Sequence, residues 1–214
     1  MEDAQVVFAN RVLLQECLDS GRLLIGEVLL GKDYSLRHAA DVGRDDLISQ
    51  SVSTGAREVA RYDEEGNFRP LKTAPNLRRG WVIRASSLEE MEMALEHLYP
   101  SALGLWHAFL AKRLHPTSLR ETLDRQTGMY RITQLLTPQQ AGELVSRSCT
   151  SEGGCLRTIL WDLAPREPVT TLPESKLSLE SLPEGRIPLI CRELCNLVVA
   201  AARPIAKGNL PKKA

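Results

Sequence analysis

The chain lacks an excess of charge of either sign, because its 214 residues include 27 basic and 27 acidic side chains. A protein that binds nucleic acid through bulk electrostatics needs a basic field. Long hydrophobic runs are lacking too. The most apolar stretches, Leu23 to Leu30 and Leu197 to Ala202, fall far short of the roughly 20 residues that span a bilayer. We therefore expect no nucleic-acid partner and no membrane association.

The N-terminal sequence, Met1 to Gln5, lacks the cationic and apolar regions of a secretory signal. The expected compartment is therefore the cytoplasm, where thiols are kept reduced. The five cysteines are then better interpreted as thiols than as a disulfide framework. Phosphate-binding motifs are missing as well, since neither a G-x-G-x-x-G sequence nor a Walker lysine follows a predicted strand.

The first part of the chain combines one helix with short strands. Apolar spacing predicts a helix over Val7 to Leu18, and short runs bounded by turn residues predict strands. The expected strands are Leu23 to Leu30 with Tyr34 to Ala39 as a hairpin, Ala56 to Tyr62 with Asn67 to Leu71 as a second hairpin, and Trp81 to Arg84. With a boundary near Ser86, residues 1–85 form an N-terminal α+β domain with antiparallel hairpins.

Residues 86–214 are expected to be mainly helical. Ser86 or Ser87 can cap a helix with Glu89 or Glu90 three residues on, and Thr137 and Pro138 open another helix that runs toward Cys149. Further expectations are helices over Leu103 to Leu114, Thr117 to Gln126 and Ile190 to Arg203, extended chain over Met129 to Thr133 and Cys155 to Leu163, and a loop over Ala164 to Arg186. The predicted fold class is α+β.

Four of the five cysteines fall in the last third of the chain, while Cys17 stands alone. Cys149 and Cys155 flank Thr150 to Gly154, and Cys191 and Cys195 would share one face of the predicted final helix. Thiolates are soft ligands that suit an iron–sulfur cluster or zinc. The wide first spacing is atypical of zinc sites. A cluster, a zinc ion, and inert or redox-active thiols all remain open on the residues alone.

Three arginines lie near the cysteines in the sequence. Arg147, Arg157 and Arg192 could offset the negative charge of a tetrathiolate site, or could be ordinary solvated side chains. Gly153 and Gly154 would let backbone amides approach a bound sulfur.

Several stretches together resemble a bacterial protein family. They are Glu58 to Asp63, Phe68 to Leu71, Gly80 to Trp81, Trp106 to Ala108, Leu119 to Thr122, Arg125 to Arg131, Cys149, and Cys155 to Trp161. In the family that they resemble, two sirohydrochlorin-chelatase-like domains of the CbiX type are followed by a stabilising domain and by a domain that binds a 4Fe-4S cluster. The resemblance implies that Cys149, Cys155, Cys191 and Cys195 are the cluster ligands.

The resemblance implies a cluster-binding electron-transfer or redox accessory of sirohydrochlorin or tetrapyrrole metabolism. The chelatase half has no counterpart here, since His38, His97, His107 and His115 all lie in segments predicted to have other structure. We therefore do not expect this chain to be an enzyme alone, and we expect a separately encoded chelatase or a redox partner. A structural zinc-binding interaction module is the second hypothesis, and a metal-free thiol–disulfide switch is the third. The oligomeric state stays open.

Overall fold

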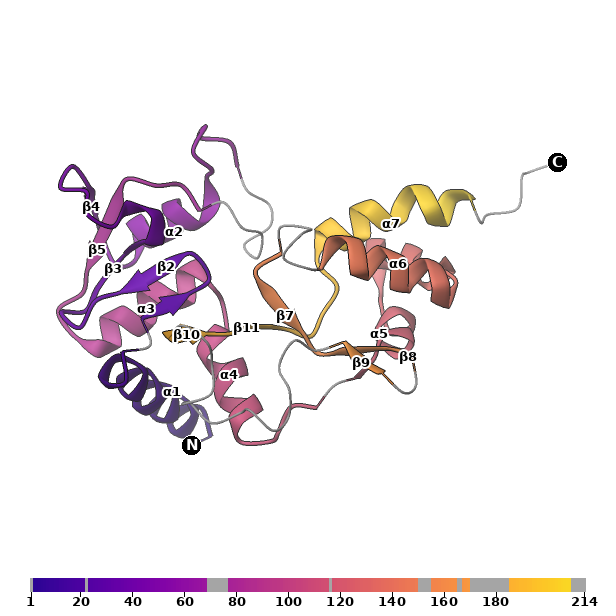
Figure 1. The fold of residues 1–214 in the computed structure, drawn as a ribbon, viewed down its shortest axis with the longest axis horizontal. Coiled ribbons are helices and arrows are strands. Elements are labelled where there is room, and N and C mark those ends of the chain that lie inside the picture. Colours follow the sequence, from indigo (N-terminus) through magenta and orange to yellow (C-terminus); the bar gives the residue numbers. More distant parts are fainter. Residues whose placement is uncertain are drawn as a thin grey trace. The chain divides into compact units, whose positions relative to one another are not determined.

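The structure is a computed structural model that describes residues 2–21, 23–68, 77–115, 117–149, 155–164, 167–169 and 185–208. The chain forms two compact units (Figure 1). The first contains Met1–Leu114 and the segment that ends at Leu189, and the second begins at His115 and resumes at Ile190. The first unit thus extends beyond the predicted boundary near Ser86. The cause is packing: the helices that follow Ser86 lie against the first helix of the chain.

A mixed sheet of six short strands forms the centre of the first unit. Its order is β10-β1-β2-β3-β5-β4. The strands are β1 (Leu24–Ile25), β2 (Val28–Leu30), β3 (Ser35–His38), β4 (Ile48–Gln50), β5 (Trp81–Arg84) and β10 (Arg186–Ile187). The pairs β1–β2, β2–β3 and β3–β5 are antiparallel, whereas β4–β5 and β1–β10 are parallel. Among the antiparallel pairs, β2–β3 is the predicted first hairpin. A turn at Gly26, where φ is +57°, divides the predicted strand Leu23 to Leu30.

Helices α1 (Glu2–Asp19), α3 (Leu88–Leu98) and α4 (Ala102–Leu110) accompany this sheet, and α1 packs against both of the others. The Ser87 side chain caps α3 by accepting from the N–H of Glu90, as its sequence predicts. The following turns of α3 bury Met91, Leu95 and Leu98. A short 3₁₀ turn, η1 (Ala39–Asp41), follows β3.

The predicted second hairpin is wrong. Thr54–Arg61 forms helix α2, and only an isolated bridge joins Tyr62 to Phe68. The small residues of this segment fit both the helical and the strand periodicity. In the structure, Ala56, Val59 and Ala60 are buried together on one helical face. Packing of α2 against α3 therefore decides the conformation. The end of the predicted partner strand lies outside the described residues.

The second unit is mainly helical, with two small sheets. Its helices are α5 (Leu119–Asp124), the 3₁₀ helix η2 (Gly128–Leu135), α6 (Pro138–Ser148) and α7 (Asn196–Gly208). One sheet pairs β7 (Arg157–Ile159) with β11 (Leu189–Cys191), and the other has the order β6 (Thr117–Ser118), β8 (Trp161–Ala164), β9 (Glu167–Val169). Helices α6 and α7 lie side by side (Figure 1) and share one apolar core.

Three predictions in this unit are wrong. The predicted loop over Ala164 to Arg186 contains strand β9, and residues 165–166 and 170–184 of it lie outside the described residues. Met129 to Thr133 is not extended but belongs to η2. The predicted helix over Ile190 to Arg203 begins only at Asn196, because Leu189–Cys191 forms β11. Pro188 disfavours helix in the residue before it, and the buried Leu189 and Ile190 gain a strand partner in β7.

The helix that approaches Cys149 and the α+β class are both as predicted. Thr137 and Gln140 form a reciprocal capping box at the start of α6. Sheet and helices together confirm an α+β protein with an N-terminal sheet region and a mainly helical C-terminal region. Within the described residues, no helix has both the length and the apolar character needed to cross a membrane.

Candidate metal centre

The four clustered cysteines all lie in the second unit, at the ends of different elements. Cys149 is the C-terminal cap of α6, and Cys155 directly precedes β7. Cys191 ends β11, and Cys195 directly precedes α7. The prediction that Cys191 and Cys195 share a helix face is therefore wrong. Element ends nevertheless suit ligands, because the backbone is free to turn there.

Three of these cysteines pack against one apolar core. Cys149, Cys191 and Cys195 are partly buried against a cluster of buried side chains. That cluster consists of Leu119, Leu123, Leu136, Ala141, Leu144, Val145, Ile159, Leu194, Val198, Val199, Ala202 and Ala206. The helices α6 and α7 therefore fix the positions of cysteines that are far apart in the sequence.

The electrostatics couple the fourth cysteine to these three. Burial first, and then negative charge on Cys155, Cys191 and Cys195, together raise the pKa of Cys149 to about 12. The charges of all four cysteines of the second unit thus act on one another around Cys149, whereas Cys17 is fully buried in α1 of the first unit.

Cys191 has one charged neighbour of opposite sign. Burial raises the pKa of its thiol to about 11, and the positive charge of Arg157 opposes this rise. The sulfur also contacts the carbonyl oxygen of Glu193 at 3.3 Å. A thiol with such a pKa is protonated at neutral pH, so a bound metal must displace its proton.

Arg157 contacts a cysteine sulfur. Its backbone N–H donates to the Sγ of Cys155 at 3.5 Å, and its Nη1 donates to the carbonyl oxygen of Ile190 at 3.1 Å. Its Nε is buried without a hydrogen-bond partner among the described residues. Arg147 is exposed. The loop with Gly153 and Gly154 lies outside the described residues.

These features fit an iron–sulfur cluster better than a single ion. Zinc needs all its sulfur ligands within about 2.3 Å of one point. Among the described residues, no three His, Cys, Asp or Glu side chains are arranged to hold one metal ion. A cluster is wider, so its thiolates stand farther apart, and buried N–H donors near the sulfurs are typical of its surroundings. Arg157 donates its backbone N–H to Cys155, and its Nε is a buried donor without a partner among the described residues.

Comparisons with known proteins agree with this division of the chain. Residues 9–110 match the family model of the DR2241 stabilising domain. Residues 111–204 match the family model of a 4Fe-4S iron-sulfur cluster binding domain. The second unit is therefore similar in sequence to iron–sulfur cluster binding domains. No curated protein matches the sequence significantly.

A solved structure is similar to both units. It is DR2241 from Deinococcus radiodurans, described as a multi-domain protein with structural similarity to chelatases and with two additional novel domains. The sequence identity is 32% and the TM-score is 0.69. The match covers 91% of this chain but only 41% of DR2241. The predicted stabilising and cluster-binding parts are thus supported, whereas neither family match names a sirohydrochlorin chelatase of the CbiX type.

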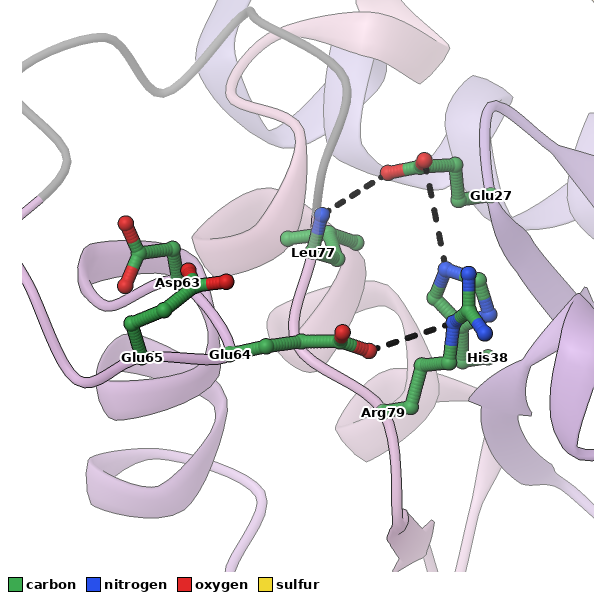
Figure 2. Close-up of a pocket in the computed structure, with 7 residues that line it drawn as sticks. All are labelled: Glu27, His38, Asp63, Glu64, Glu65, Leu77 and Arg79. Carbon is green, nitrogen blue, oxygen red and sulfur yellow. Dashed lines mark hydrogen bonds and ion pairs between the residues drawn. The ribbon is translucent and has the colours of Figure 1, made fainter.

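The sequence did not predict a pocket in the first unit (Figure 2). It has a volume of about 340 Å³ and is lined by Glu27, His38, Asp63, Glu64, Glu65, Leu77 and Arg79. Most of its carboxylates already have partners. Glu27 accepts from the N–H of Leu77 at 2.9 Å, and Glu64 pairs with Arg79 at 3.1 Å. These residues come from distant segments, so no spacing in the sequence signals the pocket.

His38 in this pocket is not arranged as a metal ligand. Its Nδ1 accepts a hydrogen bond from the N–H of Ala40 at 3.0 Å, so the proton of the neutral ring resides on Nε2. That nitrogen faces Glu27 at 3.9 Å (Figure 2). The ring therefore offers the pocket a donor and no free lone pair, and the cysteines remain the candidate site.

Proposed function

We propose that the second unit binds one 4Fe-4S cluster through Cys149, Cys155, Cys191 and Cys195. The chain then serves as an electron-transfer or redox accessory in the reducing cytoplasm. The position of four cysteines at or beside the ends of α6, β7, β11 and α7 in one unit, with the charges of three acting on Cys149, carries this proposal. The iron–sulfur family match over residues 111–204 adds independent support.

The residues supply what a cluster site requires. Four soft sulfur ligands provide the coordination, and the apolar core behind Cys149, Cys191 and Cys195 limits the access of water. The amide of Arg157 donates to Cys155, and the guanidinium of the same residue offsets negative charge at Cys191. Bound in this way, the cluster would accept and return one electron.

The role in tetrapyrrole metabolism rests on the chelatase similarity stated for DR2241. This chain spans 41% of that protein. We propose that a separately encoded chelatase is its partner. The cluster-binding unit would exchange electrons with the partner, or report the redox state to it, while the partner inserts the metal.

The first experiment is anaerobic purification, followed by a visible spectrum and assays of iron, acid-labile sulfide and zinc per chain. We expect a brown protein with about four iron and four sulfide per chain. A colourless protein with about one zinc would replace the cluster by a structural zinc module, which should unfold on chelation. A protein without metal would return the cysteines to the third hypothesis, the thiol–disulfide switch.

Single replacements assign the ligands. Each of Cys149→Ser, Cys155→Ser, Cys191→Ser and Cys195→Ser should sharply reduce bound iron. Cys17→Ala is the matched control, because Cys17 is buried in the first unit and should leave iron unchanged. Wild-type iron in all four serine variants would exclude the ligand set.

The partner is tested with a chelatase expressed separately. Metal insertion into sirohydrochlorin is measured with and without this chain, and again with the Cys191→Ser variant. We expect the intact chain, and not the variant, to change the rate or its dependence on added reductant. An identical rate in all three mixtures would remove the tetrapyrrole role and leave the cluster assignment untouched.

A further inference from the structure

Arg157 links two of the four cysteine positions. Its backbone N–H donates to the sulfur of Cys155 at 3.5 Å. Its side-chain Nη1 donates to the carbonyl oxygen of Ile190 at 3.1 Å, and Ile190 directly precedes Cys191. The guanidinium therefore lies against the C-terminal end of β11, where Cys191 is the last residue of the strand.

The Nε of the same guanidinium has no acceptor. It is buried, and none of the described residues accepts a hydrogen bond from it. Within the described part of the second unit, no other buried side-chain nitrogen or oxygen lacks a partner. A buried donor without an acceptor is costly, above all on a charged group, so such an atom calls for an explanation. A sulfur atom of a cluster bound at the cysteines would provide the missing acceptor.

The charge of Arg157 acts in the same place. Its guanidinium is anchored at the carbonyl oxygen of Ile190, the residue directly before Cys191. Reduction of a cluster adds negative charge, and both a fixed positive charge and a hydrogen bond to sulfur stabilise that added charge. The reduced state thus gains more from Arg157 than the oxidised state.

Resting on the cluster assignment made above, we propose that Arg157 is a positioning residue that raises the reduction potential of the bound cluster. Held by Ile190, its guanidinium supplies a buried N–H donor and a positive charge beside Cys191. Arg147 has the same charge and stands two residues from Cys149, as Arg157 stands two residues from Cys155, but it is exposed. It should leave the potential unchanged.

The test compares Arg157→Gln, Arg157→Lys and the control Arg147→Gln with the wild type. Iron and sulfide per chain are measured first, and the midpoint potential is then determined by redox titration with the signal of the reduced cluster. At one fixed ambient potential, Arg157→Gln should raise the oxidised-to-reduced ratio at least tenfold, a shift of about 59 mV for a one-electron couple. Arg157→Lys keeps the charge but loses the N–H fork, so it should shift the ratio in the same direction by less. Arg147→Gln should not shift it.

The outcomes separate the two proposals. A wild-type protein without iron and sulfide refutes the cluster itself. Wild-type potentials in both Arg157 variants, with full iron and sulfide, refute the role of Arg157 and keep the cluster. If Arg157→Gln loses its cluster, Arg157→Lys decides: a lowered potential supports the role, and an unchanged one refutes it. An equal shift in Arg147→Gln would also refute the role, since it would show a general effect of charge.

Discussion

The carboxylate of Asp41 accepts a hydrogen bond of 2.7 Å from the backbone N–H of Gly80, which lies 39 residues later in the chain. The same carboxylate binds the Nη1 of Arg44 at 3.0 Å, and the Asp41 side chain is only 1% exposed. Asp41 therefore fastens the turn after β3 to the residue that precedes β5. Both strands belong to the sheet of the first unit, so this contact helps to set their register.

Asp41→Ala should lower the free energy of unfolding of the first unit by about 2 kcal/mol or more. The reason is that the Gly80 N–H and the Arg44 guanidinium both lose a buried charged acceptor. Asp46→Ala is the matched control, because Asp46 also pairs with Arg44 but is 71% exposed. The loss of stability in Asp46→Ala should be clearly smaller, because exposed ion pairs contribute little. Urea unfolding of both variants checks the difference, and equal costs would contradict it.

Gly26→Ala should destabilise the first unit by about 2–5 kcal/mol. An added Cβ would lie 2.6 Å from the Cζ and Oη of Tyr99, at a φ of +57°. Tyr99 cannot easily move away, because its hydroxyl accepts from the N–H of Glu27 at 2.9 Å.

Gly43→Ala separates the strain of the backbone from the clash. Gly43 has a φ of +83°, with no described atom within 4 Å of an added Cβ. Gly43→Ala should therefore lower the free energy of unfolding by only about 1 kcal/mol. If the two alanine variants unfold at the same urea concentration, the close approach of Tyr99 to Gly26 contributes nothing.

The elements that were predicted correctly are those whose signals are local. Ser87 caps α3, and Thr137 with Gln140 caps α6, so these starts could be read from neighbouring residues. Parallel pairing of β1 with β10 joins Ile25 to Ile187 and has no local signal. The helix α2 was missed for a related reason, since its conformation depends on packing against α3.

The candidate site shows the same division between local and distant information. The cysteines could be chosen from thiol chemistry and their grouping, but the place of Cys191 on a strand depends on its pairing with β7. The sequence offered three arginines as neighbours of the cysteines. Only the fold reveals that the Nη1 of Arg157 donates to the carbonyl oxygen of Ile190. It also reveals that the buried Nε of Arg157 has no hydrogen-bond partner among the described residues.

Thr137→Ala should destabilise the second unit by about 1 kcal/mol. The Thr137 hydroxyl accepts from the N–H of Gln140 at 3.2 Å, and the Gln140 side chain accepts from the N–H of Thr137 at 3.0 Å. Loss of the hydroxyl leaves the first turn of α6 without its cap. Hydrogen exchange of the peptide that contains α6 should quicken in Thr137→Ala. Thr137→Ser keeps the hydroxyl and should retain near-normal protection; equally fast exchange in both variants would show that the cap is dispensable.

The metal-free second unit should lose stability as the pH rises above about 9. Burial raises the pKa of Cys149 to about 12 and that of Cys191 to about 11, from an ordinary thiol value of 9.0. The folded chain therefore keeps these protons to a higher pH than the unfolded chain does. Their stabilising contribution is complete below about pH 9 and is lost as the pH rises through the folded values.

Urea midpoints of the metal-free, reduced protein at pH 7.5, 9 and 10.5 test this dependence. Lysines and tyrosines also titrate in this range, so the comparison needs a variant without the two thiols. In the Cys149→Ala and Cys191→Ala double variant, the midpoint should fall less steeply above pH 9 than in the wild type, whatever its absolute value. If the urea midpoints of the wild type and the double variant fall equally steeply, the core that α6 and α7 share protects neither thiol from deprotonation. A shallower decline would locate the buried protons at the cysteines that must release them when metal binds.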